Sequence, residues 1–124
     1  LKMFYIHSMS LRQLPPLPPS LRTLEMNLPL EQFPYLHEGL TALHIGNYVA
    51  FTTIQGLPSS IRTLSCHCDR LESITFPPQL EVLDFHRWSQ FRMPELPISL
   101  IGLSLTYLTG DLVDLRALTR LRDL

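Results

Sequence analysis

The sequence predicts an α/β solenoid, a stack of short repeating units whose strands form one curved parallel sheet. The first observation is a six-residue phrase of the form apolar, two variable, apolar, one variable, apolar, which recurs about every 20 residues. It begins at Leu1, Leu21, Leu40, Ile61, Leu80 and Leu100, and a partial seventh begins at Leu121. The second observation is a further set of apolar residues after each phrase. Self-similarity at such a period predicts stacked units that bury a continuous core against one another.

Each phrase predicts one short strand. Its last two apolar positions alternate with a period of two, as in Leu43-x-Ile45, which is typical of a half-buried strand of about three to five residues. Stacking places these strands side by side, about 4.8 Å apart, on the concave face of a curved ribbon. Residues 1–124 are then a single solenoid segment, and we expect it to be a fragment of a longer protein with only marginal stability in isolation.

The segment after each strand predicts a return path whose apolar residues point inward. Proline follows the last apolar position in four repeats, at Pro18, Pro58, Pro77 and Pro97, which favours extended or turn backbone over helix. Among the return paths only the last, residues 111–124, lacks proline, so a short helix is allowed there with Asp111 as its N-cap. The inward sets are Leu11, Leu14 and Leu17; Leu30, Phe33 and Leu36; Phe51, Ile54 and Leu57; Leu71, Ile74 and Phe76; Phe91, Met93 and Leu96; and Leu112, Leu115 and Leu118.

Composition excludes several classes of function. The 45% hydrophobic content suffices for a core, and the net charge of −1 and scattered basic residues predict no nucleic-acid partner. No apolar run approaches the ~18 residues of a membrane span, so no membrane insertion is predicted. Cys66 and Cys68 flank a single residue and imply no disulfide framework, which favours a reducing, intracellular compartment or a fold without need of disulfides. No phosphate-binding loop, nucleophile elbow or zinc-protease motif occurs, so neither an enzyme nor a cofactor is predicted.

The repeated phrase resembles the leucine-rich-repeat superfamily, whose core is L-x-x-L-x-L-x-x-N/C-x-L. The stretch LRQLPPLPPSLRTL, residues 11–24, is similar to the proline-marked repeats of secreted bacterial effectors of the YopM and IpaH type. The phrases LPPSLRTL, LPSSIRTL and LPISLIGL also resemble FNIP-type repeats. The chain departs from the family at the ninth position, where an asparagine ladder is usual, so apolar packing and turn hydrogen bonds must hold these corners. That position carries Met9, Pro29, Tyr48, Asp69, Trp88 and Leu108.

Counted from the first residue of each phrase, the fifth and seventh positions of each repeat face away from the core and carry small, polar, variable residues, as expected of a recognition surface. The candidate partner-binding residues are Tyr5, His7, Glu25, Asn27, His44, Ser65, His67, Asp84, His86, Ser104 and Thr106. Adjacent strands would bring His67 and His86 close together, with His44 and Asp84 nearby, a set that could bind a divalent metal or respond to pH. A solvated polar face explains the same residues, and no metal site is predicted.

The leading hypothesis is a non-catalytic module that binds a protein partner through the concave strand face. One alternative is the substrate-recognition part of a larger effector ubiquitin ligase, whose catalytic domain would lie outside these residues. Another is a structural subunit of a large assembly, packed through its ends and convex side. In each case, further repeats or other chains are expected to cover the open ends of the stack.

Overall fold

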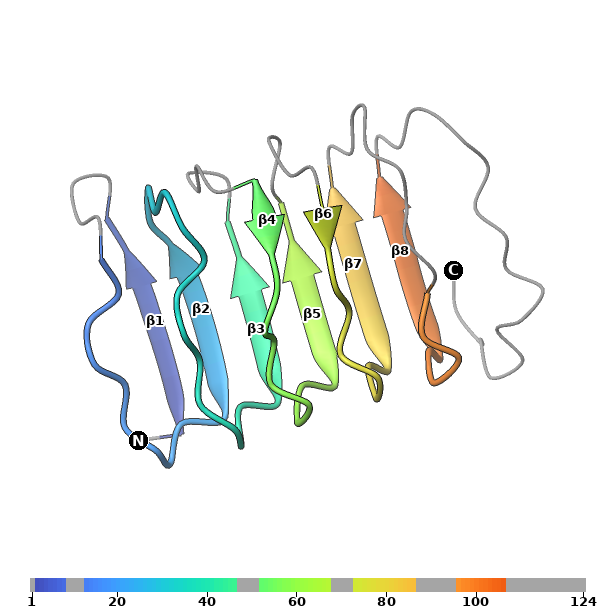
Figure 1. Ribbon diagram of the computed structural model, residues 1–124, viewed down its shortest axis with the longest axis horizontal. Helices are drawn as coiled ribbons and strands as arrows, with labels where there is room; N and C mark the ends of the chain where they lie inside the picture. Colours follow the sequence, from blue (N-terminus) through green and yellow to red (C-terminus); the bar gives the residue numbers. More distant parts are fainter. Residues whose placement is uncertain (1, 9–12, 47–51, 68–72, 87–95, 107–124) are drawn as a thin grey trace.

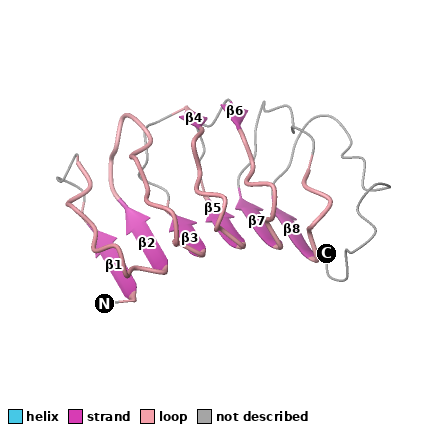
Figure 2. Cartoon of the chain, turned by 60° about the horizontal axis from the view of Figure 1, so that its bottom comes forward, coloured by secondary structure: helices cyan, strands magenta, loops and turns pink. Residues whose placement is uncertain are grey.

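The chain forms a parallel β-solenoid (Figure 1). The structure, a computed structural model, describes residues 2–8, 13–46, 52–67, 73–86 and 96–106. A six-stranded sheet contains β1 (Met3–His7), β2 (Thr23–Asn27), β3 (Ala42–Ile45), β5 (Thr63–Cys66), β7 (Val82–His86) and β8 (Gly102–Thr106). A smaller two-stranded sheet pairs β4 (Thr53–Ile54) with β6 (Ser73–Ile74). The return segments form a second layer over the strands of the main sheet (Figure 2).

The strand prediction is confirmed for all six phrases. Neighbouring strands pair in parallel and in the same register, so equivalent positions of successive repeats lie side by side. Among the described residues there is no helix, which agrees with a return path of extended and turn backbone. The short helix allowed at residues 111–124 lies outside the described residues.

The core lies between the two layers. The fourth position of the phrase supplies a column of leucines, and those of the inner strands, Leu24, Leu43, Leu64 and Leu83, are fully buried. Removing a leucine side chain from water stabilises a fold by about 1.5–3 kcal/mol, so this column is a large part of the driving force for stacking. Phe4, the equivalent residue of β1, is only half-buried and packs against the core from one side.

The return segments supply the other half of the core. Five of the residues expected to point inward are buried, namely Leu30, Leu36, Ile54, Ile74 and Leu96, and five more pack against the core, namely Leu14, Leu17, Phe33, Leu57 and Phe76. The remaining eight, Leu11, Phe51, Leu71, Phe91, Met93, Leu112, Leu115 and Leu118, lie outside the described residues. The Phe76 ring meets the edge of the Phe85 ring at 5.9 Å between centroids and 75° between planes, which joins the two layers.

The prolines mark the turns that lead back into the strands. In four repeats the proline carbonyl accepts a hydrogen bond from the amide three residues later, at N···O distances of 3.1–3.3 Å, as from Leu21 N to Pro18 O and from Ile61 N to Pro58 O. Proline fits the first position of this turn because only its carbonyl takes part in the turn hydrogen bond, and the amide hydrogen that it lacks is not used. The second repeat has His37 instead of proline, and the turn that follows contains Gly39, whose φ is +105°.

Two hydrogen-bond ladders tie successive repeats together. The carbonyl of the second phrase position accepts two successive amides of the next repeat. Thr41 O, for example, accepts from Arg62 N at 2.8 Å and from Thr63 N at 3.1 Å. The hydroxyl of Ser60 also bridges repeats, since it accepts from Gly39 N at 2.9 Å and donates to Leu40 O at 2.7 Å.

The corner after β2 shows what replaces an asparagine ladder. Leu28 is fully buried there, and Leu30 N donates to Leu28 O at 2.8 Å across a tight turn around Pro29. Apolar packing and a turn hydrogen bond hold this corner, as expected. The ninth positions of the other repeats, at Met9, Tyr48, Asp69, Trp88 and Leu108, lie outside the described residues.

Candidate recognition face of the sheet

One face of the six-stranded sheet is turned away from the return segments, and we call it the outer face. Because side chains alternate along a strand, this face is built from positions three, five and seven of each repeat, counted from the first residue of its phrase. Position five forms a row across the whole sheet, in which the strand register joins Tyr5, Glu25, His44, Ser65, Asp84 and Ser104 as successive neighbours. Every residue of this row is at least partly accessible to solvent.

Position seven forms a second row at the carboxyl ends of the strands. His7 pairs with Asn27 at one end of the sheet, and His86 pairs with Thr106 at the other. Between them, Gly46 N donates to Met26 O at 2.9 Å and His67 N donates to Ile45 O at 3.0 Å, which continues the ladder beyond β3 and β5. All eleven candidate residues therefore belong to two adjacent rows of one face.

Position three completes the face with a row that the sequence did not single out. It contains Met3, Thr23, Ala42, Thr63, Val82 and Gly102, in register from β1 to β8. These residues are small, β-branched or apolar, and the Met3 side chain is 62% exposed. The signal that identifies them is the same period of two that placed positions five and seven. The outer face thus combines one largely apolar row with two polar rows.

The outer face is hollowed over β1, β2, β3 and β5. A depression of about 230 Å³ is lined by Tyr5, Glu25, Met26, Asn27, His44, Ile45, Gly46, Ser65 and His67. Six of these are candidates selected from the sequence. The remaining candidates continue the same two rows of the register, namely His7, Asp84, His86, Ser104 and Thr106.

Gly46 creates room in this hollow because it places no side chain in the seventh row. The Asn27 side chain occupies that room, and a Cβ atom built on Gly46 would lie only 2.6 Å from Asn27 Cγ. A methyl group there must therefore push the Asn27 amide aside. Since the displaced atoms are the end of a flexible side chain, the change should alter the site and cost little stability.

We expect Gly46→Ala to shift the NMR signals of the Asn27 side-chain amide and to change the free energy of unfolding by less than about 1 kcal/mol. Gly102→Ala is the matched control, because its new Cβ would lie at an ordinary 3.8 Å from Val82. Unchanged Asn27 signals in Gly46→Ala would show that Asn27 does not cover Gly46.

The three rows of the outer face carry acidic residues but neither lysine nor arginine. The acidic residues are Glu25 and Asp84. The arginines that precede β2 and β5 bind turn carbonyls instead. Arg22 Nη1 donates to Pro19 O and Leu21 O, both at 3.2 Å, and Arg62 Nη1 donates to Gln79 O at 3.2 Å.

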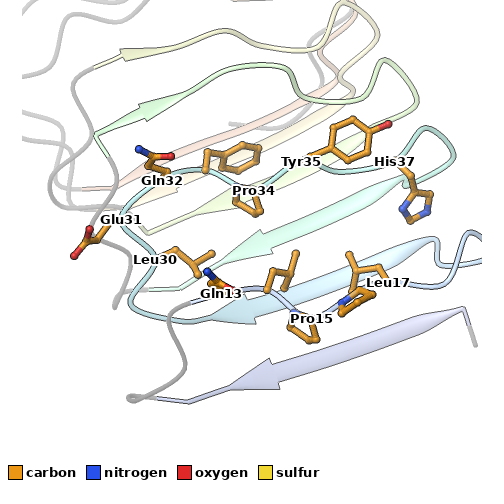
Figure 3. Close-up of a pocket in the computed structure, with 12 residues that line it drawn as sticks. Gln13, Pro15, Leu17, Leu30, Glu31, Gln32, Pro34, Tyr35 and His37 are labelled. Carbon is orange, nitrogen blue, oxygen red and sulfur yellow. The ribbon is translucent and has the colours of Figure 1, made fainter.

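A second depression, of about 720 Å³, lies on the return side between residues 13–17 and 30–37 (Figure 3). Much of its lining completes the core, since Leu30 is buried and Leu14, Leu17 and Phe33 pack against the core cluster. His37 Nε2 donates to Leu21 O at 3.2 Å. We regard this groove as the seam between two return segments, although it is larger than the hollow on the outer face.

The described part of the chain holds no group of three or more His, Cys, Asp or Glu side chains placed to bind a metal ion. His67 follows β5 and His86 ends β7, which are neighbouring strands, and the side chain of His86 lies outside the described residues. Within those same residues, no helix is long and apolar enough to cross a membrane.

Comparison with protein-family models, with curated proteins and with solved structures found no match to this chain. Its class follows from geometry alone. Six parallel strands in common register, joined by extended return segments over a shared core, define a repeat protein of the parallel β-solenoid type.

Proposed function

We propose that this solenoid is of the leucine-rich-repeat type and serves as a non-catalytic protein-interaction module that binds its partner through the outer face of the sheet. The observation that carries the proposal is the contrast between the two faces of each strand. In β2, β3 and β5 the inward residues are buried apolar side chains, whereas the outward residues are polar or small and vary from one repeat to the next. Stacked repeats use such surfaces for recognition.

The hollow over β1, β2, β3 and β5 makes part of this polar surface concave. Partners bind best where a few side chains enter a depression surrounded by other contacts. The neighbouring row at position three contributes apolar area from Met3 and Val82, both of them exposed. A surface with an apolar strip beside polar rows matches the mixed character of transient protein interfaces.

We further propose that another repeat or another chain covers the edge of the sheet at β1. Phe4 and Ile6 of this strand are only half-buried, although the equivalent residues of the inner strands β2, β3 and β5 are almost completely buried. Covering them would remove additional apolar surface from water.

Site-specific photo-crosslinking tests the proposed face. A photoreactive amino acid is placed at Ser65, in the centre of the outer face, or at Tyr35, which is 88% exposed on the return side. The full-length protein is then irradiated in cells that express it. We expect one partner to crosslink from Ser65 and not from Tyr35.

The same comparison separates this function from a structural one. A subunit packed into an assembly through its return side would crosslink from Tyr35 and leave Ser65 unreacted. That result, or the absence of a specific crosslink from Ser65, would contradict the proposal.

A further inference from the structure

The hollow of the outer face contains a single carboxylate. Of the residues that line it, Glu25 alone is acidic, and neither lysine nor arginine is among them. Building on the proposed function, we propose that this hollow is a subsite for one arginine side chain of the partner. In that arrangement the guanidinium group pairs with the Glu25 carboxylate and lies against the Tyr5 ring.

The protein itself supplies no counterion for Glu25. Among the described residues, none forms an ion pair or a hydrogen bond with the Glu25 side chain. Arg22, which directly precedes β2, donates to the carbonyl groups of Pro19 and Leu21 instead. Glu25 is also only partly exposed, and a carboxylate that is partly shielded from water is attracted more strongly to a cation than one on a flat, open surface. A cationic group of the partner therefore has a defined place to bind.

Tyr5 makes the hollow suited to a planar cation. It pairs with Glu25 in the register between β1 and β2, so the two side chains start from neighbouring points about 4.8 Å apart. The Tyr5 side chain is 58% exposed, which leaves its ring open to a ligand. A guanidinium group binds carboxylates through its edge and stacks on aromatic rings through its face, whereas an ammonium group is a compact point charge. These two neighbours therefore favour arginine over lysine.

The size and the other walls of the hollow fit one side chain. Its volume of about 230 Å³ lies below the roughly 300–1,000 Å³ of typical small-molecule sites. His44 pairs with Glu25 on the side away from Tyr5, and Ser65 pairs with His44 in turn, so this wall is polar. Arginine has five N–H donors, and a serine hydroxyl can accept one that the carboxylate leaves unused. Arginine side chains that enter such depressions often dominate the affinity of an interface.

An NMR titration of the full chain with capped amino acids tests the proposal. The probes are N-acetyl-arginine N-methylamide, its lysine counterpart, and its citrulline counterpart, which has nearly the shape of arginine but no charge. We expect arginine to shift the backbone amide signals of Tyr5, Glu25 and His44 in a saturable way at millimolar concentration. Lysine should bind about threefold more weakly because it does not stack, and citrulline about tenfold more weakly because it is neutral.

Two substitutions separate the carboxylate from the ring. Glu25→Gln removes the charge and keeps the size of the side chain, so it should weaken arginine binding about tenfold. Tyr5→Leu keeps the carboxylate and removes the ring, so arginine should lose about threefold in affinity and its advantage over lysine should disappear. Glu31→Gln is the matched control, because Glu31 is an exposed carboxylate on the return side. It should leave the binding of all three probes unchanged.

Equal or tighter binding of citrulline or lysine, arginine shifts that persist in Glu25→Gln, or a loss of binding in Glu31→Gln would each overturn the proposal. The crosslink from Ser65 separates this inference from the proposed function. If arginine leaves the signals of the hollow unmoved and Ser65 still crosslinks a partner, the hollow is not an arginine subsite and the proposed function stands. If Ser65 gives no specific crosslink, the proposed function fails, and this inference, which rests on it, fails with it.

Discussion

Replacing Phe85 with alanine is expected to lower the free energy of unfolding by about 3–5 kcal/mol. The Phe85 side chain is 1% exposed and is among the largest fully buried side chains of the core. It extends from β7 to the Phe76 ring of the return segment, so its loss leaves a cavity and removes an aromatic contact between the two layers. Urea unfolding followed by circular dichroism measures the change.

Tyr35→Ala is the control for this prediction, since Tyr35 is an aromatic residue of similar size that is 88% exposed. We expect it to change the free energy of unfolding by less than about 0.5 kcal/mol. If the two variants were equally stable, Phe85 would not lie between the layers.

Thr63→Pro should destabilise the protein strongly through the backbone. Thr63 begins β5, which lies between β3 and β7 in the sheet, and its amide donates to Thr41 O at 3.1 Å. Proline has no amide hydrogen, and losing a hydrogen bond of this kind costs about 0.5–1.5 kcal/mol because Thr41 O keeps the bond from Arg62 N; the steric clash of the ring in the sheet adds to this cost. We expect unfolding at much lower urea concentration than in the wild type.

Thr63→Val separates this backbone effect from the loss of the threonine side chain. Valine keeps the amide and the β-branched shape, and the side chain at this position lies on the outer face. The free energy of unfolding of Thr63→Val should therefore stay within about 0.5 kcal/mol of the wild-type value. A proline variant as stable as the valine variant would contradict the parallel ladder between β3 and β5.

Much of the fold could be predicted because the period of about 20 residues and the burial of the apolar residues have the same cause, which is the stacking of equivalent repeats. The phrase places Leu24, Leu43 and Leu64 at equivalent points of successive repeats, and only stacking can bury all three. Proline positions also predicted turns correctly, since the ring restricts the backbone wherever it occurs. The burial of Leu28 was not predicted, because it follows the strand and belongs to neither apolar series.

The candidate site was only partly predictable. Alternation along the strands placed Glu25 and His44 on one face, and the register then made them neighbours. The hollow could not be predicted, because it depends on how the Asn27 side chain lies over Gly46. The hydrogen bonds of Arg22 and Arg62 could not be predicted either. Their side chains donate to turn carbonyls whose positions are known only from the folded structure.

A pair of engineered cysteines tests the register that aligns Glu25, His44, Ser65 and Asp84 in one row. In a Cys68→Ser background, which retains the buried Cys66, His44→Cys/Ser65→Cys places two thiols on paired residues of β3 and β5. Neighbouring strands separate Cα atoms by about 4.8 Å, within the range of a disulfide, whereas His44→Cys/Asp84→Cys spans two gaps and about 10 Å. Peptide mapping after mild oxidation should find the disulfide in the first pair alone. A disulfide that formed only in the second pair, or in neither, would contradict the stacked register on which the recognition row depends.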